Sequence, residues 1–188
     1  PGLGFHQTIL YTPNWRTTLE PQAPLGLVHK ACQPSGIQLP ADSSQNPRSI
    51  FMIRPIVKDI LFLQRKAEKA SRKDRAAGRD LLDTLAAHSD TCVGLAANMI
   101  GVSKAIIAIR DEKRFLLLYN PVITMHSLTY YDTEEGCLSL AGKRPCRRYD
   151  WVEVKYEDED FHKKRKRFQG FTAEIIQHEI DHLEGILI

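Results

Sequence analysis

The chain has 188 residues, of which 43% are apolar and 26% are charged, and its formal net charge is only +3. These values are typical of one globular domain, with or without an extension, and they argue against a dedicated nucleic-acid binder. No run approaches eighteen apolar residues, and no basic segment followed by an apolar core begins the chain, so neither a membrane span nor a secretory signal is predicted. The four cysteines lack disulfide-framework spacing, so we expect a cytoplasmic protein.

Residues 1–51 differ in composition from the rest of the chain. They hold many of the prolines, few charges and a polar turn cluster at residues 40–47, without sustained periodicity. We interpret residues 1–51 as an N-terminal extension or an expression-derived leader, and residues 52–188 as the main domain, with Met52 as a natural first residue. The alternative is a small docking segment, anchored by Phe5, Ile9, Leu10, Tyr11 and Trp15.

Residues 70–88 are predicted to form an amphipathic helix, because small and apolar side chains recur on one face. Two apolar runs follow, residues 105–109 and 115–119, and the polar residues between them predict a hairpin. Asn120–Pro121 is expected to break or redirect the second strand.

Two further strands are expected, at residues 128–131 and 151–156, the second because apolar and charged residues alternate. An acidic run at residues 157–160 then precedes a basic run at residues 163–167. We expect these runs to face each other across a hairpin and to pair their charges. The alternative is a transient contact of the basic run with ribosomal RNA.

Residues 170–185 end the chain with an HExxH motif in a helical pattern. Ile176, Ile180 and Leu183 form an apolar stripe, Thr172 is predicted to cap the helix and Gly185 to end it. His178 and His182 lie one turn apart on one face. Two such imidazoles can bind one metal ion, and Glu179 between them is placed to act as a general base. The alternative is a surface helix that carries two histidines.

The third ligand of a catalytic metal site has to come from upstream. Only six residues follow His182, and Glu184 is too close along the helix to reach the same ion. Cys137 is the leading candidate, because it follows a glycine that permits close approach of the backbone and its thiolate binds metals directly. The alternative is a small buried apolar residue, as many free cysteines are.

These segments together resemble the three ordered motifs of the peptide deformylases: residues 92–101 (CVGLAANMIG), residues 135–139 (EGCLS) and residues 177–182 (QHEIDH). The resemblance covers about residues 52–188. It implies a metal-dependent hydrolase that removes the N-terminal formyl group from nascent formyl-methionyl peptides, with residues 52–188 as its catalytic domain.

The first motif departs from the family pattern at two positions. Met99 stands where the family usually has a glutamine whose amide helps to hold the oxyanion, and Cys92 replaces a glycine. A thioether donates no hydrogen bond, and loss of one oxyanion donor typically costs about a hundredfold to a thousandfold in rate. Either a neighbour such as Asn98 compensates, or the enzyme is weakened.

The resemblance also implies roles for single residues. Cys137, His178 and His182 would hold the metal, and Glu179 would act first as base and then as acid. The backbone N–H of Leu138 would hold the oxyanion, with Met99 in the place of the amide donor.

Three further residues are predicted to bind the substrate. The backbone at Gly94 and Gly136 would pair with an extended formyl-methionyl peptide. Arg148 would line the substrate groove, and a solvated loop is the alternative for this residue. No membrane partner is expected.

One thiolate and two imidazoles favour zinc as the divalent ion. The resemblance instead implies ferrous iron in the cell, which zinc or nickel readily replaces. The fold class we predict is α+β, with antiparallel strands packed around a C-terminal metal-binding helix and the helix at residues 70–88 outside.

Two rival functions remain open at this point. One is a related metal-dependent amide deacylase or peptidase that uses the Met99 pocket for another acyl group. The other is a non-catalytic protein with a structural metal, in which the fourth coordination position would be closed.

Overall fold

The computed structural model describes residues 52–112 and 114–188. Our interpretation of residues 1–51 as an extension or leader therefore lies outside the described residues. In chain order the elements are α1 (Ile60–Leu63), η1 (Arg72–Asp74), α2 (Arg75–Ala87), β1 (Gly94–Ala96), η2 (Ala97–Ile100), β2 (Ile106–Asp111), β3 (Arg114–His126), β4 (Tyr130–Cys137), β5 (Leu140–Tyr149), β6 (Trp151–Glu157), β7 (Lys163–Gln169) and α3 (Gly170–Leu183).

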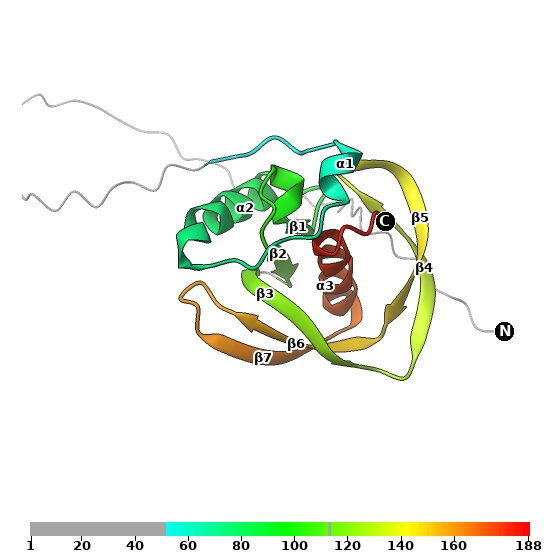
Figure 1. Cartoon of the computed structure of the whole chain (residues 1–188). Coiled ribbons are helices and arrows are strands. Elements are labelled where there is room, and N and C mark those ends of the chain that lie inside the picture. The colour runs from blue at the N-terminus through cyan, green and yellow to red at the C-terminus, as the bar shows by residue number, and fades with distance from the viewer. Residues whose placement is uncertain (1–51, 113) are drawn as a thin grey trace, which may run out of the picture. The chain divides into compact units, whose positions relative to one another are not determined.

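The strands form two antiparallel sheets. The larger has the order β1-β2-β3-β6-β7, and the smaller consists of β4 and β5. Helix α3 lies between the larger sheet and the β4–β5 hairpin (Figure 1). The predicted α+β class, with antiparallel strands around a C-terminal helix, is confirmed.

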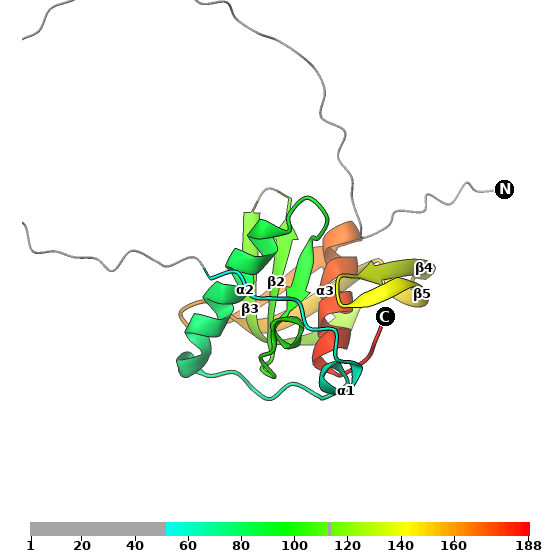
Figure 2. The same cartoon turned by 90° about the horizontal axis from the view of Figure 1, so that it is seen from above.

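Strand β2 is buried along its apolar run because helices cover both of its faces. All four residues of Ile106–Ile109 are inaccessible to solvent. A strand covered on both faces reads as a continuous apolar run rather than as an alternating one. Helix α2 lies on one side of β2 and α3 on the other (Figure 2). This packing fixes the direction of α3, which carries the HExxH motif.

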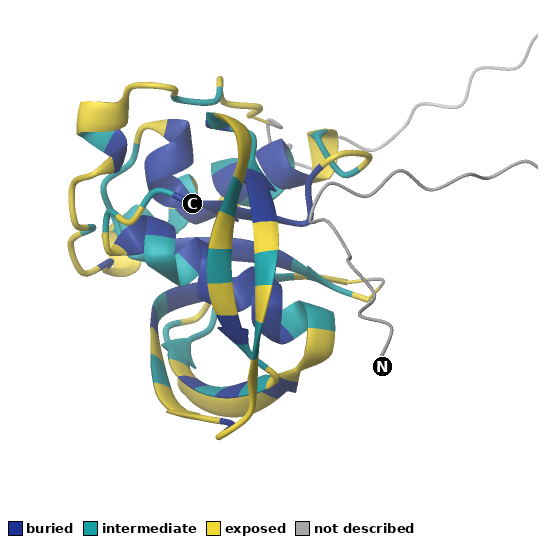
Figure 3. Cartoon of the chain, turned by 90° about the vertical axis from the view of Figure 1, so that its right-hand side faces the viewer, coloured by how far each residue is buried: buried dark blue, intermediate teal, exposed yellow. Residues whose placement is uncertain are grey.

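The β4–β5 hairpin has a different character. Its residues alternate between exposed and partly buried along most of both strands, and Figure 3 shows this pattern on the side of the molecule that the hairpin covers. Buried residues lie at two places in the hairpin: Glu135 and Gly136 near the end of β4, and Arg148 near the end of β5. The hairpin is thus partly solvated along most of its length and is tied to α3 by the side chains of Tyr131, Glu135 and Arg148.

The predicted hairpin of residues 105–119 is confirmed as β2–β3, and Asn120 redirects the second strand without ending it. Asn120 has a positive φ of 51°, and the register shifts between Tyr119 and Val122. Before this point β3 pairs with β2, and after it β3 pairs with β6. One long strand therefore joins the two halves of the sheet.

Two predicted boundaries were wrong. The first turn of the helix expected from residue 70 is the 3-10 turn η1, and α2 itself starts at Arg75. The strand expected at residues 128–131 starts at Tyr130, and Leu128 precedes it in a connection where it is 96% exposed. No helix in the described part of the chain is both long and apolar enough to cross a membrane.

The acidic and basic runs do face each other across the β6–β7 hairpin, but only part of the expected pairing occurs. Glu157 lies opposite Lys163, and Lys164 forms an ion pair with Asp158. Arg165 and Lys166 instead contact carboxylates outside the acidic run, those of Glu153 and Asp111.

Candidate metal centre

Helix α3 presents the motif residues to the core. It starts at Gly170 with Gln169 as N-cap, and no side chain caps it. The predicted cap by Thr172 was wrong: its hydroxyl donates to Asp111 at 3.1 Å instead. Gly185 does follow the helix end with φ of 77°, a left-handed conformation that suits glycine.

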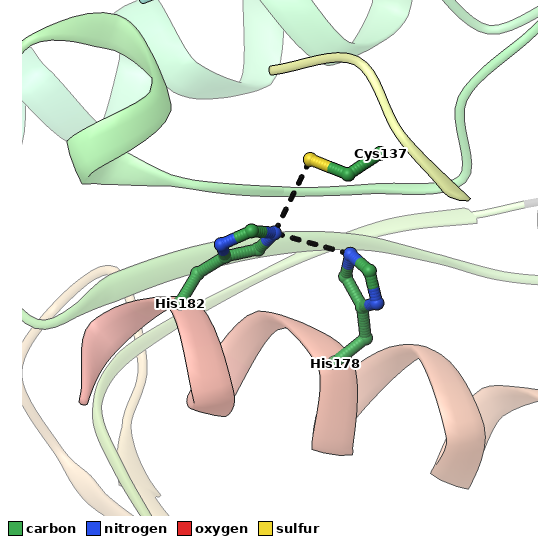
Figure 4. Close-up of side chains that lie close together, drawn as sticks. All are labelled: Cys137, His178 and His182. Carbon is green, nitrogen blue, oxygen red and sulfur yellow. Dashed lines mark hydrogen bonds between the residues drawn. The ribbon is translucent and has the colours of Figure 1, made fainter. Parts of the chain in front are cut away.

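Cys137 at the end of β4 meets His178 and His182 on α3. One ligand atom from each of these three residues lies within 4.8 Å of the others. The Nε2 atom of His182 lies 3.3 Å from the Cys137 sulfur and 3.1 Å from Nε2 of His178 (Figure 4). The three donors therefore converge on one point, although Cys137 and His178 are 41 positions apart in the chain.

A buried carboxylate orients His178 from behind. Glu135 accepts a hydrogen bond from His178 Nδ1 at 2.7 Å, which leaves Nε2 directed toward Cys137 and His182. A carboxylate in this position fixes the orientation of a ligand imidazole and raises its basicity. The sequence did not predict this role, because nothing local to Glu135 indicates a partner on α3.

Arg148 completes this network, and its predicted place in the substrate groove was wrong. The guanidinium binds both oxygens of Glu135 at 2.7 Å and also donates to Asp181 at 2.6 Å. Its side chain is only 5% exposed and does not line the metal pocket. Burial raises the pKa of Glu135, but hydrogen bonds from Arg148 and His178 outweigh this effect and hold that pKa at about 2.

The electrostatics of the two histidines differ. Burial lowers the pKa of His182 to about 3, so its imidazole is neutral, which is the form that binds metals. Burial also lowers the pKa of His178, but the neighbouring groups of Cys137 and Glu135 raise it more strongly, to about 10. The surroundings of His178 thus favour a positive charge on its imidazole. A proton or a bound metal ion can supply this charge.

Glu179 is buried beside the ligands with one carboxylate oxygen unpaired. Its Oε2 has no hydrogen-bond partner within the described structure. Burial raises the pKa of Glu179 to about 7. A Cβ added at Gly94 would lie 2.5 Å from Oε1 of Glu179, so glycine is needed on β1 for this close approach.

A small pocket opens onto the three ligands. It has room for about one water molecule, and Glu179 lines it together with Met99, Leu138, Gly94 and Gly136. The structure therefore brings every predicted site residue except Arg148 to this pocket or to its ligands. Sequence reasoning assigned no role to two further lining residues, Thr91 and Cys92.

Asn98 and Cys92 belong to the motif in which Met99 stands in the place of the usual glutamine. The amide of Asn98 donates to the backbone oxygens of His182 at 2.7 Å and Leu63 at 3.4 Å, so it does not replace the amide donor, and that alternative was wrong. The thiol of Cys92 donates to the Gly94 carbonyl at 2.8 Å. Burial raises the pKa of Cys92 to about 12, so this thiol stays protonated and is a poor metal ligand.

The donor set fits a divalent transition metal. One sulfur and two imidazole nitrogens lie together, the Ser139 N–H donates to the Cys137 sulfur at 3.3 Å, and Glu135 supports His178. Sites of this kind prefer zinc or iron over magnesium or calcium, which select oxygen ligands. Three protein ligands leave a coordination position for water or substrate.

Comparison with known proteins settles the family. The sequence model described as polypeptide deformylase matches residues 53–188. The chain belongs to the peptide deformylase family. It is therefore related to hydrolases, and its metal-ligand cluster agrees with the divalent metal that these enzymes use.

Individual relatives agree with this assignment. Peptide deformylase from Clostridium beijerinckii is 53% identical over 137 residues, which cover 73% of this chain and all of that protein. The enzyme from Picosynechococcus is 36% identical over 66% of this chain and 71% of its own length.

Solved structures show the same fold. A Met-Ala-Ser-bound class I type b peptide deformylase from Acinetobacter baumannii superposes with a TM-score of 0.67 at 28% identity, covering 73% of this chain and 97% of that one. The Thermotoga maritima peptide deformylase gives a TM-score of 0.65 at 27% identity, covering 72% and 94%.

Proposed function

We propose that this peptide deformylase removes the formyl group from formyl-methionyl nascent peptides at the pocket bounded by Cys137, His178, His182 and Glu179. The observation that carries the proposal is the convergence of three metal-binding atoms within 4.8 Å beside a buried, unpaired carboxylate oxygen. A structural metal site would have no need for such an oxygen, whereas hydrolysis needs a base at this place.

Cys137, His178 and His182 are the proposed metal ligands. A divalent ion held there supplies Lewis acidity to the substrate carbonyl and to the attacking water. The Glu135–Arg148 pair keeps His178 in the orientation for binding, and the Ser139 N–H stabilises the thiolate of Cys137. Supporting groups of this kind typically change metal affinity or activity by about 10- to 100-fold.

Glu179 is the proposed general base and acid. It takes a proton from the water that attacks the formyl carbon and later delivers this proton to the leaving amine. A pKa of about 7 suits both steps, because the group is then close to half-protonated near neutral pH. Burial keeps bulk water away from the carboxylate during these transfers.

Leu138, Gly94 and Gly136 are the proposed substrate contacts. Strand β1 is at the edge of its sheet, so its outer backbone groups can pair with an extended peptide. The Leu138 N–H would stabilise the oxyanion, and Met99 would contribute an apolar wall in place of a donor. The Met-Ala-Ser peptide bound to the Acinetobacter relative supports a peptide that begins with methionine as the ligand of this cleft.

We further propose ferrous iron as the ion in the cell, with zinc or nickel able to replace it. The cytoplasm is the proposed location, and the free thiols of Cys92, Cys137 and Cys146 support a reducing environment. Residues 52–188 are the proposed catalytic domain, supported by a family match that begins at Ile53.

Formate release tests this function. Anaerobically prepared, iron-loaded protein is mixed with formyl-, acetyl- and unmodified Met-Ala-Ser, and the Glu179→Ala variant is the control. We expect turnover of the formyl peptide alone, and a loss of about a thousandfold in the variant, which should keep its metal. Cleavage of the acetyl peptide in preference would favour the deacylase alternative. No turnover with one metal bound per chain would favour a structural role for the metal.

A further inference from the structure

Two residues that line the metal pocket, Thr91 and Cys92, have no part in the proposed chemistry. Thr91 is exposed and Cys92 is only 7% exposed, so Thr91 lies at the mouth of the pocket and Cys92 forms part of its inner wall. The family pattern has a glycine in place of Cys92. The side chain of Cys92 therefore fills space in this wall that a glycine would leave open.

The thiol of Cys92 is held in place by the outer edge of β1. The backbone N–H of Arg110 donates to the Val93 carbonyl at 2.8 Å. Gly94, the next residue, is paired with Ile109. Hydrogen-bonded pairs in an antiparallel ladder alternate with pairs whose N–H and C=O groups point outward, so the Gly94 carbonyl points away from β2. The Cys92 thiol donates to this carbonyl at 2.8 Å, and its sulfur therefore lies where the free edge of β1 meets the pocket.

The sulfur of Cys92 also lies near the groups that act on the substrate in the proposed function. Cys92, Glu179 and the ligand Cys137 line the same pocket, which has room for about one water molecule. Burial raises the pKa of the Cys92 thiol to about 12, and the negative charges of Glu179 and Cys137 add to this rise. An acyl group that reaches Glu179 and the ligand cluster through so small a pocket has to lie against the Cys92 side chain.

The other walls of this pocket show which side chain limits its size. Gly94 and Gly136 have no side chains, and a Cβ added at Gly94 would already lie 2.5 Å from Oε1 of Glu179. Met99 is only 1% exposed, but its long side chain is flexible and adapts readily to its neighbours. Cys92 has a short side chain whose thiol is bonded to Gly94. It is therefore a fixed wall that takes no part in the chemistry.

The size of the pocket distinguishes a formyl group from larger acyl groups. A formyl group carries a hydrogen on its carbonyl carbon, whereas an acetyl group carries a methyl group about as large as a water molecule. A pocket with room for about one water molecule does not take this methyl group together with the attacking water. We propose that Cys92 is a specificity-determining residue, whose side chain closes the pocket to acyl groups larger than formyl. This inference rests on the proposed function and names the residue that restricts its substrate.

The acyl selectivity of Cys92 variants tests this inference on the full, iron-loaded chain. Release of the free N-terminal amine is measured with formyl- and acetyl-Met-Ala-Ser, and the ratio of the two kcat/KM values is compared with that of the wild type. This formyl-to-acetyl ratio should fall about tenfold or more in Cys92→Ala, and further in Cys92→Gly, because one carbon group in a pocket is typically worth about 10- to 200-fold. Cys92→Ser keeps a side chain of similar size and a donor for Gly94, so its ratio should stay within about threefold of the wild type.

Cys146→Ala is the matched control, because it is the same substitution in β5, outside the pocket, and it should leave the ratio unchanged. Binding of unmodified Met-Ala-Ser, measured by isothermal titration calorimetry, should be unchanged in every variant, since this peptide has no acyl group to meet Cys92. An unchanged ratio in Cys92→Ala and Cys92→Gly, or an equal change in the control, would overturn the inference alone. Weaker binding of Met-Ala-Ser in the Cys92 variants would also overturn it, because the side chain would then support the whole cleft. No amine release from the formyl peptide by the wild type would overturn the proposed function, and the inference with it.

Discussion

The metal centre and the β6–β7 hairpin both carry clusters of charged side chains, but the cluster at the centre is buried and the one on the hairpin is exposed. At the centre, the side chains of Glu135 and Arg148 are 0% and 5% exposed and meet at 2.7 Å. On the β6–β7 hairpin, Lys164 and Arg165 are about half exposed and pair with carboxylates at the surface. Water screens the second kind of pair but not the first. Burial, more than composition, therefore decides how strongly a charged cluster stabilises the fold.

The largest effect on stability is expected from breaking the buried pair. Arg148→Met should lower the free energy of unfolding by about 3–5 kcal/mol, because it leaves Glu135 and Asp181 without their cation. The neighbouring Arg147→Met is the matched control, since Arg147 pairs with Asp132 in an exposed position. Urea unfolding should leave the control close to the wild type. Small, equal effects would contradict the distinction between the two regions.

Removing the ligand thiolate should weaken metal binding strongly. Cys137→Ser is expected to lose more than about a hundredfold in metal affinity, because a serine hydroxyl does not replace a thiolate. Cys92→Ser should keep the metal, although Cys92 lines the same pocket, because its thiol stays protonated and bonds to Gly94. Competition with a chelating dye measures both affinities. Loss of metal in the Cys92 variant would show that the ligand set is misassigned.

Restoring an amide donor should raise activity. Met99→Gln places a donor in the pocket beside Glu179, and we expect kcat/KM for the formyl peptide to rise about tenfold. Met99→Leu, which adds no donor, should not raise it. A lower rate in the glutamine variant would indicate that the pocket has adapted around the thioether.

The smallest effect is expected at Glu174, at the start of α3. Burial raises the pKa of this carboxyl above its ordinary value of 4.5, and Tyr131 donates to it at 2.5 Å. The contribution of the Glu174 carboxyl to the free energy of unfolding is complete below pH 4.5. It declines as the pH rises, because this carboxyl ionises more easily in the unfolded chain than in the folded one. Glu174→Gln keeps an acceptor for Tyr131 and lacks this decline. Its thermal midpoint should exceed that of the wild type at pH 8 and match it at pH 4.

The sequence predicted most of the centre because helix geometry fixes its spacing. His178 and His182 are one turn apart, and residues 135–139 formed a motif that placed Cys137 at the site. The Glu135–Arg148–Asp181 network was not predicted, since its members come from β4, β5 and α3 and only the tertiary fold brings them together. The same limit explains why Arg148 was placed in the groove.

The overall arrangement of strands was predicted for a similar reason, and its details were not. Apolar runs and the turn residues between them located β2 and β3, and alternation located β6, but these patterns did not show that β3 changes partners at Asn120. That change depends on the positive φ of Asn120 and on its amide, which bonds to the Ala70 backbone from 50 residues away.

X-ray absorption spectroscopy of the zinc-loaded protein tests most directly the claim that Cys137, His178 and His182 form a metal centre with one open coordination position. We predict one sulfur ligand at about 2.3 Å, two imidazole nitrogens at about 2.0–2.1 Å and one oxygen from solvent. Two sulfur ligands would mean that Cys92 joins Cys137 in the site. A shell of four protein ligands would leave no position for substrate and would contradict the proposed hydrolysis.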